Sequence, residues 1–341
     1  MAWKKCITLL CLLLAPAAVL AAEETDASPP ETWLAAGEKL AEEVNETKKV
    51  ETTAETKPTG DGPPLPLHTI EGVGGGLVVP MAYLVNPGPE GTVIGKPAVS
   101  VTHLSMCSGK NLQVFAVTET FLRRIEVGYA LNRFDLGSLP NAIKHLTGGA
   151  ARIRRQEVYL HHFNVRGLVI EENSFNLPLP AVVVGMQAKV NGGIAGMDDS
   201  TGGLLTSIGY ERRNGIDFTI HASKTIPEIL FGRPLILTFG VRSSNASNIG
   251  LTGFGDECQV TVECDVVTSI TDNFALVYEF RQKNNPYDEA PGILGDEDDW
   301  HAIRVAYIVD DHFVIAGGWA YLGPVGNGID SAWGIQLKYE F

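Results

Sequence analysis

The carboxyl-terminal stretch S-A-W-G-I-Q-L-K-Y-E-F, residues 331–341, decides the fold of this chain. Side chains on a β-strand alternate between two faces. In this stretch one face carries the apolar and aromatic residues Trp333, Ile335, Leu337, Tyr339 and Phe341. The other face carries Gly334, Gln336, Lys338 and Glu340. A strand with one apolar and one polar face, ending on an aromatic residue, is typical of the closing strand of a membrane-spanning β-barrel.

The amino terminus predicts export from the cytoplasm. Lys4 and Lys5 precede an apolar run over residues 7–14, and Ala21 ends a small-residue cleavage site. The apolar run is shorter than the roughly 20 residues that a membrane-spanning helix needs. We therefore expect residues 1–21 to be a signal peptide that is removed after Sec-type export.

Two segments precede the strand pattern. Residues 22–66 are rich in Asp, Glu, Thr and Pro and almost lack aromatic residues, which predicts a disordered acidic segment in the periplasm. We interpret it as a solvated linker; the alternative is that a short helix over 31–44 docks a periplasmic partner. Residues 67–96 are rich in glycine, which lets backbone pack closely against another surface. We expect this second segment to plug the barrel, with an extra strand as the alternative.

Period-two alternation recurs from Pro97 to the end and predicts an all-β fold, a transmembrane antiparallel up-and-down β-barrel of about 12 strands over residues 97–341. The predicted strands are 97–106, 111–121, 123–133, 155–169, 180–191, 215–226, 234–246, 257–270, 273–284, 299–309, 312–322 and 331–341. Long connections alternate with tight turns, as the two ends of such a barrel require. Aromatic residues fall near both strand ends and predict two interfacial belts, made of Trp300, Trp319 and Trp333 outside and of Phe274, Phe313 and Phe341 on the periplasmic side.

The same parity predicts which side chains line the lumen. The candidates are Arg124, Glu126, Arg166, Lys189, Asp217, Arg242, Glu263, Asp265, Glu279, Arg281 and Arg304. Basic and acidic residues are nearly balanced in this set, so we expect them to pair across strands and to leave a narrow or plugged lumen. Twelve strands lie between small filled barrels and wide porins, so the strand number alone leaves the pore width open.

Charge and composition exclude several classes of protein. The net charge of −14 argues against nucleic-acid binding. The acidic loop over 288–299 is interpreted as a solvated surface loop, with a divalent-cation site as the alternative. The chain has no C-x-x-C spacing, and we assign it neither a metal nor a cofactor.

Two resemblances support the barrel. Through Trp333, Leu337, Tyr339 and Phe341, the last strand resembles the insertion signal of bacterial outer-membrane β-barrel proteins, although Ala332 stands where a polar residue is usual. The region from about Thr69 to the end resembles an exported Gram-negative family of unknown function. That second resemblance is carried by I-E-G-V-G-G-G-L-V-V-P (70–80), R-R-I-E-V-G-Y-A-L-N-R-F-D-L (123–136), G-L-T-G-F-G-D (250–256), E-F-R-Q-K-N-N-P (279–286) and E-D-D-W (297–300). Together they imply an outer-membrane location, contact with lipid and lipopolysaccharide, and recognition by the barrel-assembly machinery.

Three functional hypotheses follow. The first is a structural or passive-transport role like that of a narrow porin, in which small polar solutes or ions pass only if the lumen opens. The second is a plugged barrel that acts as an interaction scaffold. The third and weakest is an outer-membrane lipid hydrolase with His162 as its base. The chain has no G-x-S-x-G motif to mark a nucleophile, so no catalytic residue is assigned.

Overall fold

The structure is a computed structural model that describes residues 65–153, 156–230, 232–288, 297–325 and 329–341. The expectations for the signal peptide, for the acidic segment up to residue 64 and for the helix over 31–44 lie outside these residues.

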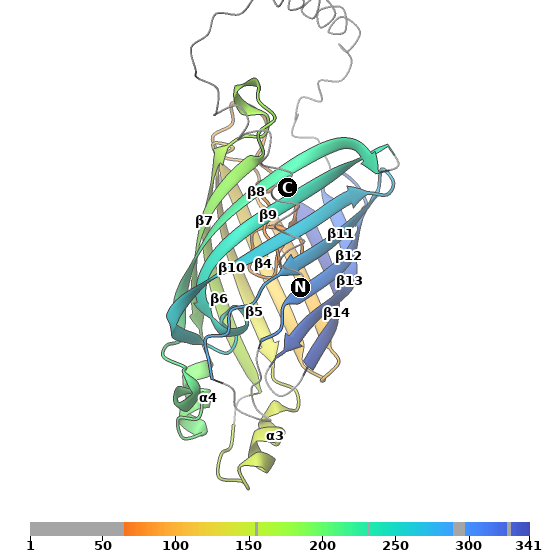
Figure 1. The fold of residues 1–341 in the computed structure, drawn as a ribbon. Coiled ribbons are helices and arrows are strands. Elements are labelled where there is room, and N and C mark those ends of the chain that lie inside the picture. The colour runs from red at the N-terminus through yellow and green to blue at the C-terminus, as the bar shows by residue number, and fades with distance from the viewer. Residues whose placement is uncertain (1–64, 154–155, 231, 289–296, 326–328) are drawn as a thin grey trace, which may run out of the picture. The chain divides into compact units, whose positions relative to one another are not determined.

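A closed antiparallel barrel of 12 strands forms the body of the molecule (Figure 1). Each strand pairs with its neighbours in sequence, and the last strand closes the barrel against the first. The strands are β3 (Ala98–Met106), β4 (Asn111–Phe121), β5 (Ile125–Asp135), β6 (Glu157–Ile170), β7 (Ala181–Asn191), β8 (Asn214–Leu230), β9 (Arg233–Ala246), β10 (Phe254–Ser269), β11 (Phe274–Arg281), β12 (Trp300–Ile308), β13 (Phe313–Pro324) and β14 (Ile329–Glu340). The predicted up-and-down topology and strand number are confirmed.

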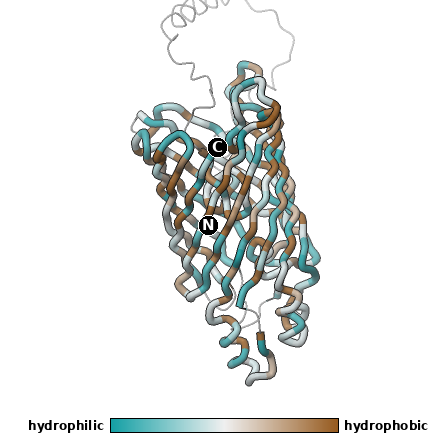
Figure 2. The backbone as a smooth tube through the Cα atoms, turned by 180° about the vertical axis from the view of Figure 1, so that it is seen from behind, coloured by the Kyte–Doolittle hydropathy of each residue, from teal (hydrophilic) through white to brown (hydrophobic). Residues whose placement is uncertain are grey.

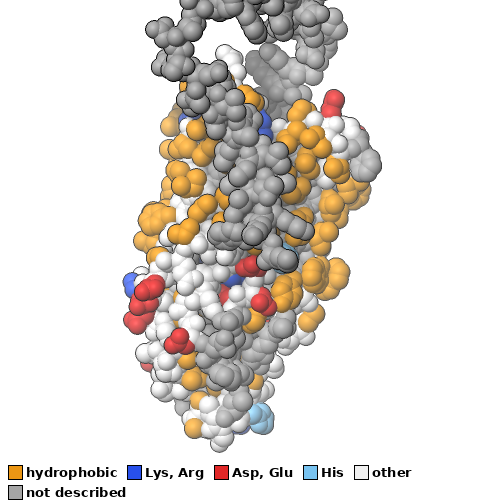
Figure 3. All heavy atoms as spheres, viewed as in Figure 1, with side chains coloured by type: hydrophobic (Ala, Val, Ile, Leu, Met, Phe, Trp, Pro, Cys, Tyr) orange, Lys and Arg blue, Asp and Glu red, His pale blue; other side chains and the backbone are white. Residues whose placement is uncertain are grey.

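The two faces of the barrel wall follow the alternation in the sequence (Figure 2). In β14, Trp333 is 66% exposed and Leu337 is 43% exposed, whereas Gln336 and Lys338 are fully buried. Hydrophobic side chains accordingly spread over the outer surface in Figure 3. An apolar outside and a polar inside are what a barrel in lipid requires.

The two ends of the barrel differ. Short turns join β4 to β5, β8 to β9, β10 to β11 and β12 to β13 at what we call the turn end, where the carboxyl terminus also lies. The opposite loop end carries the long connections and two short helices, α3 (Leu139–Leu146) and α4 (Ile194–Ser200), at the bottom of Figure 1. None of the described helices has the length and hydropathy needed to cross a membrane.

A re-entrant segment that we call the plug, residues 65–96, fills the lumen from the turn end. It starts beside Lys338, whose Nζ lies 2.5 Å from the carbonyl oxygen of Pro66, and returns to the turn end, where Ile94 bridges to Phe121. Two short strands within it, β1 (Leu67–His68) and β2 (Gly74–Gly75), pair with each other. Residues 66–82 of the plug are buried throughout.

Trp300 departs from the predicted aromatic belt. It is 3% exposed and points inward, where its indole N–H donates to the carbonyl of Leu322 over 2.7 Å. The Lys283 ammonium lies 4.1 Å from its ring centroid. Trp300 stands at a lumen position of β12, and an aromatic side chain there packs inside the barrel rather than in the headgroup region. Trp319 and Trp333, by contrast, are paired across β13 and β14, and Trp333 is exposed on the outer wall.

Candidate functional site

The predicted lumen residues meet the plug at the level of the barrel's middle and its turn end. Glu126, Arg166, Lys189, Asp217, Arg242, Glu263, Asp265, Glu279, Arg281 and Arg304 are all buried. Arg124 is the exception and corrects the sequence interpretation. It belongs to the turn between β4 and β5, where Leu122 and Arg123 have positive φ angles, so strand parity does not apply to it. Its exposed side chain pairs with Glu171 over 2.7 Å.

The centre of the site is a carboxylate of the plug surrounded by basic residues of the wall. Glu71 is fully buried, and its Oε1 lies 2.6 Å from Lys189 Nζ. Its Oε2 lies 2.7 Å from Arg281 Nη1 and 3.1 Å from Arg242 Nη2. Bonds between ionised partners are about twice as strong as neutral ones. Three strands, β7, β9 and β11, are therefore tied to one side chain of the plug.

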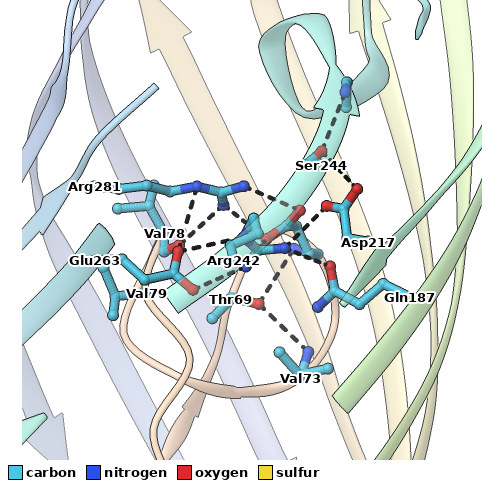
Figure 4. A network of polar contacts seen from close by, with 12 residues as sticks. Thr69, Val73, Val78, Val79, Gln187, Asp217, Arg242, Ser244, Glu263 and Arg281 are labelled. Atoms are coloured by element: carbon cyan, nitrogen blue, oxygen red, sulfur yellow. Dashed lines mark hydrogen bonds and ion pairs between the residues drawn. The ribbon is translucent and has the colours of Figure 1, made fainter. Parts of the chain in front are cut away.

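The wall also carries acidic residues that hold these cations in place (Figure 4). Asp217 Oδ2 lies 2.5 Å from Lys189 Nζ and 3.0 Å from Arg242 Nη1. Glu263 Oε1 lies 3.2 Å from Arg242 Nη2. We call these five wall residues, Lys189, Asp217, Arg242, Glu263 and Arg281, the wall cluster.

A second buried ion pair binds the plug on both sides of its tip, in the segment before Leu77 and in the segment after Val79, which we call the return limb. Arg166 Nη2 lies 2.7 Å from Glu126 Oε2, and both side chains are fully buried. The Arg166 guanidinium also donates to the carbonyl oxygens of Gly74 and Met81, over 3.1 and 2.7 Å. Glu126 accepts the backbone N–H of Val85 over 2.9 Å. The pair thus satisfies backbone groups of the plug that would otherwise be buried without partners.

Glu279 holds the tip of the plug by its backbone. Its carboxylate accepts the N–H groups of Leu77, Val78 and Val79, over 2.7, 2.8 and 2.8 Å. Successive backbone N–H groups that converge in this way form an anion-binding nest. Gly76 is required beside them, because a Cβ at this position would overlap the Glu279 carboxylate. This close approach accounts for one glycine of the cluster over 70–77.

Neutral hydrogen bonds secure the plug toward the turn end. His68 contacts Ser100 Oγ over 2.8 Å and Thr118 Oγ1 over 2.9 Å. Gln336 donates to the carbonyl of His68 over 2.7 Å. Thr120 donates to the carbonyl of Val85 over 2.5 Å. The plug is thus bonded to strands on several sides of the lumen rather than to one patch of wall.

One small cavity lies beside the plug tip. A cavity of about 10 Å³ lies between Leu77, Leu104 and Arg304, which is room for no more than one water molecule. Arg304 Nη1 has no hydrogen-bond partner within the described residues. A larger groove of about 490 Å³ lies on the outer wall, lined by apolar side chains such as Val101, Phe115 and Leu337. That groove faces the lipid side and is unsuited to a polar solute.

The loop end of the lumen is filled differently, by an apolar cluster that we call the cap. Its members from the strands and long loops include Phe134, Leu136, Ile143, Ile153, Leu160, Ile194, Met197, Ile208, Ile249, Leu251 and Tyr287. Residues of the plug tip, Ile70, Leu77 and Val78, join the same cluster. The plug and the cap therefore meet and together close the lumen.

One buried ion pair crosses the rim of the cap. Lys283 Nζ lies 2.7 Å from Glu297 Oε2, and Glu297 also accepts the backbone N–H of Asn248 over 3.1 Å. Burial lowers the pKa of Lys283, although the neighbouring Glu297 carboxylate acts in the opposite direction. At least this acidic residue of the loop over 288–299 is bonded within the protein rather than solvated. Residues 289–296 of that loop lie outside the described part of the chain.

His162, the candidate base of a hydrolase, lacks the geometry for that role. It is fully buried and lies across from Ala130 in the β5–β6 pairing. Neither of its ring nitrogens has a hydrogen-bond partner within the described residues. A general base must lie within hydrogen-bond reach of the nucleophile that it activates. Within the described residues, no three His, Cys, Asp or Glu side chains are arranged to hold a metal ion.

Glu71 is the residue that sequence reasoning missed. It is the only Asp, Glu, Lys or Arg between residues 65 and 89, and it stands at the start of the glycine cluster. A lone charge in a segment otherwise suited to burial is the signal that would have found it, because a buried charge needs a partner.

Comparison with known proteins adds a family to this geometry. A family model described as "Protein of unknown function (DUF3034)" matches residues 66–338. The chain belongs to the DUF3034 family. The matched region begins at the start of the plug, so the DUF3034 family model spans both the plug and the barrel. A search of curated protein sequences finds no match to this DUF3034 chain.

Solved structures similar to this DUF3034 chain include a porin and other outer-membrane proteins. KdgM porin aligns with a TM-score of 0.44 and 8% identity, over 72% of this chain and 99% of that one. Omp33 of Acinetobacter baumannii aligns with a TM-score of 0.39 and 9% identity, over 73% of this chain and 99% of that one. Outer membrane phospholipase A from Escherichia coli aligns with a TM-score of 0.35 and 7% identity, over 72% of this chain and 92% of that one. None of these proteins has a function that transfers to DUF3034 at such distances.

Proposed function

We propose that this protein is an outer-membrane barrel that rests closed, and that it passes small polar solutes or ions passively when the plug leaves the lumen. The apolar outer wall supports the membrane location, in contact with lipid and lipopolysaccharide after Sec-type export and insertion by the barrel-assembly machinery. Recovery of the protein in the outer-membrane fraction of cells, and its absence from the periplasm, checks this part of the proposal.

The observation that carries the proposal is the polarity of the wall behind the plug. A barrel that was only a filled structural cylinder would be as stable or more so with apolar side chains inside, because burying ion pairs costs desolvation. Instead, Arg166, Glu126 and Glu279 are buried in the wall with backbone groups of the plug as their partners. These side chains would be well solvated in a water-filled lumen. A wall with such polar side chains is compatible with a plug that moves out of the lumen.

The cap favours a second candidate function. Its cluster of apolar side chains, including Leu160, Ile194 and Met197, seals the loop end, so transport requires the loops to separate as well. A barrel closed at both halves also suits an interaction scaffold, which would use its loops outside or the acidic segment over 22–66 inside. Capture of a periplasmic protein by the 22–66 segment would favour this second function.

Planar-bilayer recordings on the full-length chain separate the two functions. We expect the wild-type protein to be closed for most of the recording. The variant Gly76→Val should open far more often, because its Cβ overlaps the Glu279 carboxylate, which cannot shift without losing its bonds to the plug tip. The tip residues Leu77 and Val78 also belong to the apolar cluster of the cap, so their withdrawal loosens the loop end as well.

Gly167→Val is the matched control. A Cβ at Gly167 meets no atom within 4 Å, so the same substitution leaves the plug in place. Folding of all three proteins is verified by heat-modifiable mobility in gel electrophoresis. If correctly folded Gly76→Val and wild-type proteins both show no channel events, transport is rejected and the scaffold remains.

A further inference from the structure

Within the described residues, the wall cluster carries one more positive than negative charge, and Glu71 of the plug pairs with its cations. Lys189, Arg242 and Arg281 contribute three positive charges, whereas Asp217 and Glu263 contribute two negative ones. Glu71 supplies the missing negative charge. With Glu71 withdrawn, the wall cluster therefore needs an anion from elsewhere, because an unpaired buried charge is costly.

The geometry selects a carboxylate. Both oxygens of Glu71 are contacted: Oε1 by the ammonium of Lys189 and Oε2 by Arg242, while the Arg281 guanidinium reaches Oε2 over 2.7 Å and Oε1 over 3.5 Å. Arginine presents its N–H groups in a planar fork that matches a planar carboxylate. The three cations stand on alternate strands, and each of them also pairs with a wall acid, Asp217 or Glu263. The donors are thus arranged by the barrel and not by the plug.

We propose that the wall cluster is an anion site for the carboxylate of a transported solute, and that Glu71 occupies it as a built-in competitor while the barrel is closed. This inference rests on the proposed function, because it requires that the plug can leave the lumen. The solute class is then small carboxylate-bearing anions. A solute that enters the site displaces Glu71 from three cations at once and favours the open barrel, since ligands shift an equilibrium through differential affinity for its two states.

Refolding of a cavity variant of the full-length chain tests the site. Glu71→Ala removes the carboxylate and leaves space for a small anion next to the three cations. The unfolded protein is refolded into detergent micelles with sodium acetate, with acetamide or with sodium chloride, and the folded fraction is measured by heat-modifiable mobility. Acetate at ten times its dissociation constant should raise the folded-to-unfolded ratio about elevenfold, while acetamide should leave it unchanged.

Two further variants keep the result interpretable. Glu71→Gln also removes the charge but fills the space, so acetate should not restore its refolding. Glu71→Asp keeps the charge and should refold without acetate. If Glu71→Ala does not refold under any condition, or if chloride restores it as well as acetate does, the carboxylate site is rejected.

Recordings on Gly76→Val test the role of the site in transport. Across a potassium chloride gradient, its reversal potential should show a preference for anions, and a cation preference would contradict the proposal. No acetate rescue together with a conducting Gly76→Val channel overturns this inference and leaves the proposed function standing. Acetate rescue together with a silent Gly76→Val protein rejects transport, and with it the solute role of the site.

Discussion

The plug and the cap close the two halves of one lumen by opposite chemistry. The plug is held by ionic and hydrogen-bonded contacts, such as those of Glu71 with Lys189 and of Arg166 with Glu126. The cap is held by apolar packing around residues such as Leu160 and Ile194. Water can replace the partners of a charged group, but it cannot replace an apolar contact. On the proposed function, the turn-end half of the lumen hydrates when the plug leaves, whereas the loop-end half is packed like a folded core.

Glycine and charge work together on the plug side. Gly76 lets the backbone reach the Glu279 carboxylate, and Gly72, with a φ of +78°, packs against Ala130 where a Cβ would overlap. A segment without side chains at these points exposes its backbone N–H and C=O groups to the wall. The wall therefore recognises the plug mainly through its backbone, with Glu71 as the one charged side chain between residues 65 and 89.

The largest expected effect comes from removing an ionic contact of the plug. Arg166→Ala should lower the free energy of unfolding by about 3–5 kcal/mol, because Glu126 is then buried without its partner. Urea unfolding from lipid vesicles measures this loss. Arg124→Ala, the control, removes an arginine from an exposed pair and should cost about 0–1 kcal/mol. If the two variants lost the same free energy of unfolding, the buried Arg166–Glu126 pair would contribute no more than an exposed pair.

The next prediction addresses the cap. Leu160→Ala should lower the free energy of unfolding by about 2–5 kcal/mol, since it leaves a cavity in a packed core. It should not raise the frequency of channel openings, because the plug contacts remain. Urea unfolding and bilayer recordings on the same preparation measure the two quantities. Frequent openings in Leu160→Ala would mean that the cap, and not the plug, controls the lumen.

The smallest expected effect separates neutral from ionic contacts within the plug. Thr120→Val removes one hydroxyl that donates to the carbonyl of Val85 and should cost about 1 kcal/mol. Amide hydrogen exchange should rise in the return limb near Val85 and stay unchanged at Leu77 in the tip. Thr268→Val, the control, removes a hydroxyl that donates to Pro234 within the wall. If the exchange rate rose equally at all amides of the plug, the plug would not be held by several independent contacts.

The barrel wall could be predicted from the sequence alone: its strands, its apolar outer face and its closing strand. These follow from alternation, which is a property of each strand's own backbone. The sequence also placed Arg166, Arg242 and Glu279 on the inner face. It failed at Arg124, because a turn interrupts the parity, and at Trp300, because inward parity outweighs the preference of an aromatic ring for the interface.

Which side chains contact one another inside the barrel could not be predicted from the sequence. Glu71 contacts Lys189, Arg242 and Arg281, residues far from it in sequence and from one another. Their meeting depends on the register of all 12 strands around the closed wall and on the path of the plug through it. Neither the register nor the path of the plug can be read from a local sequence pattern. The contacts between Glu71 and the three basic residues therefore exist only in the complete barrel.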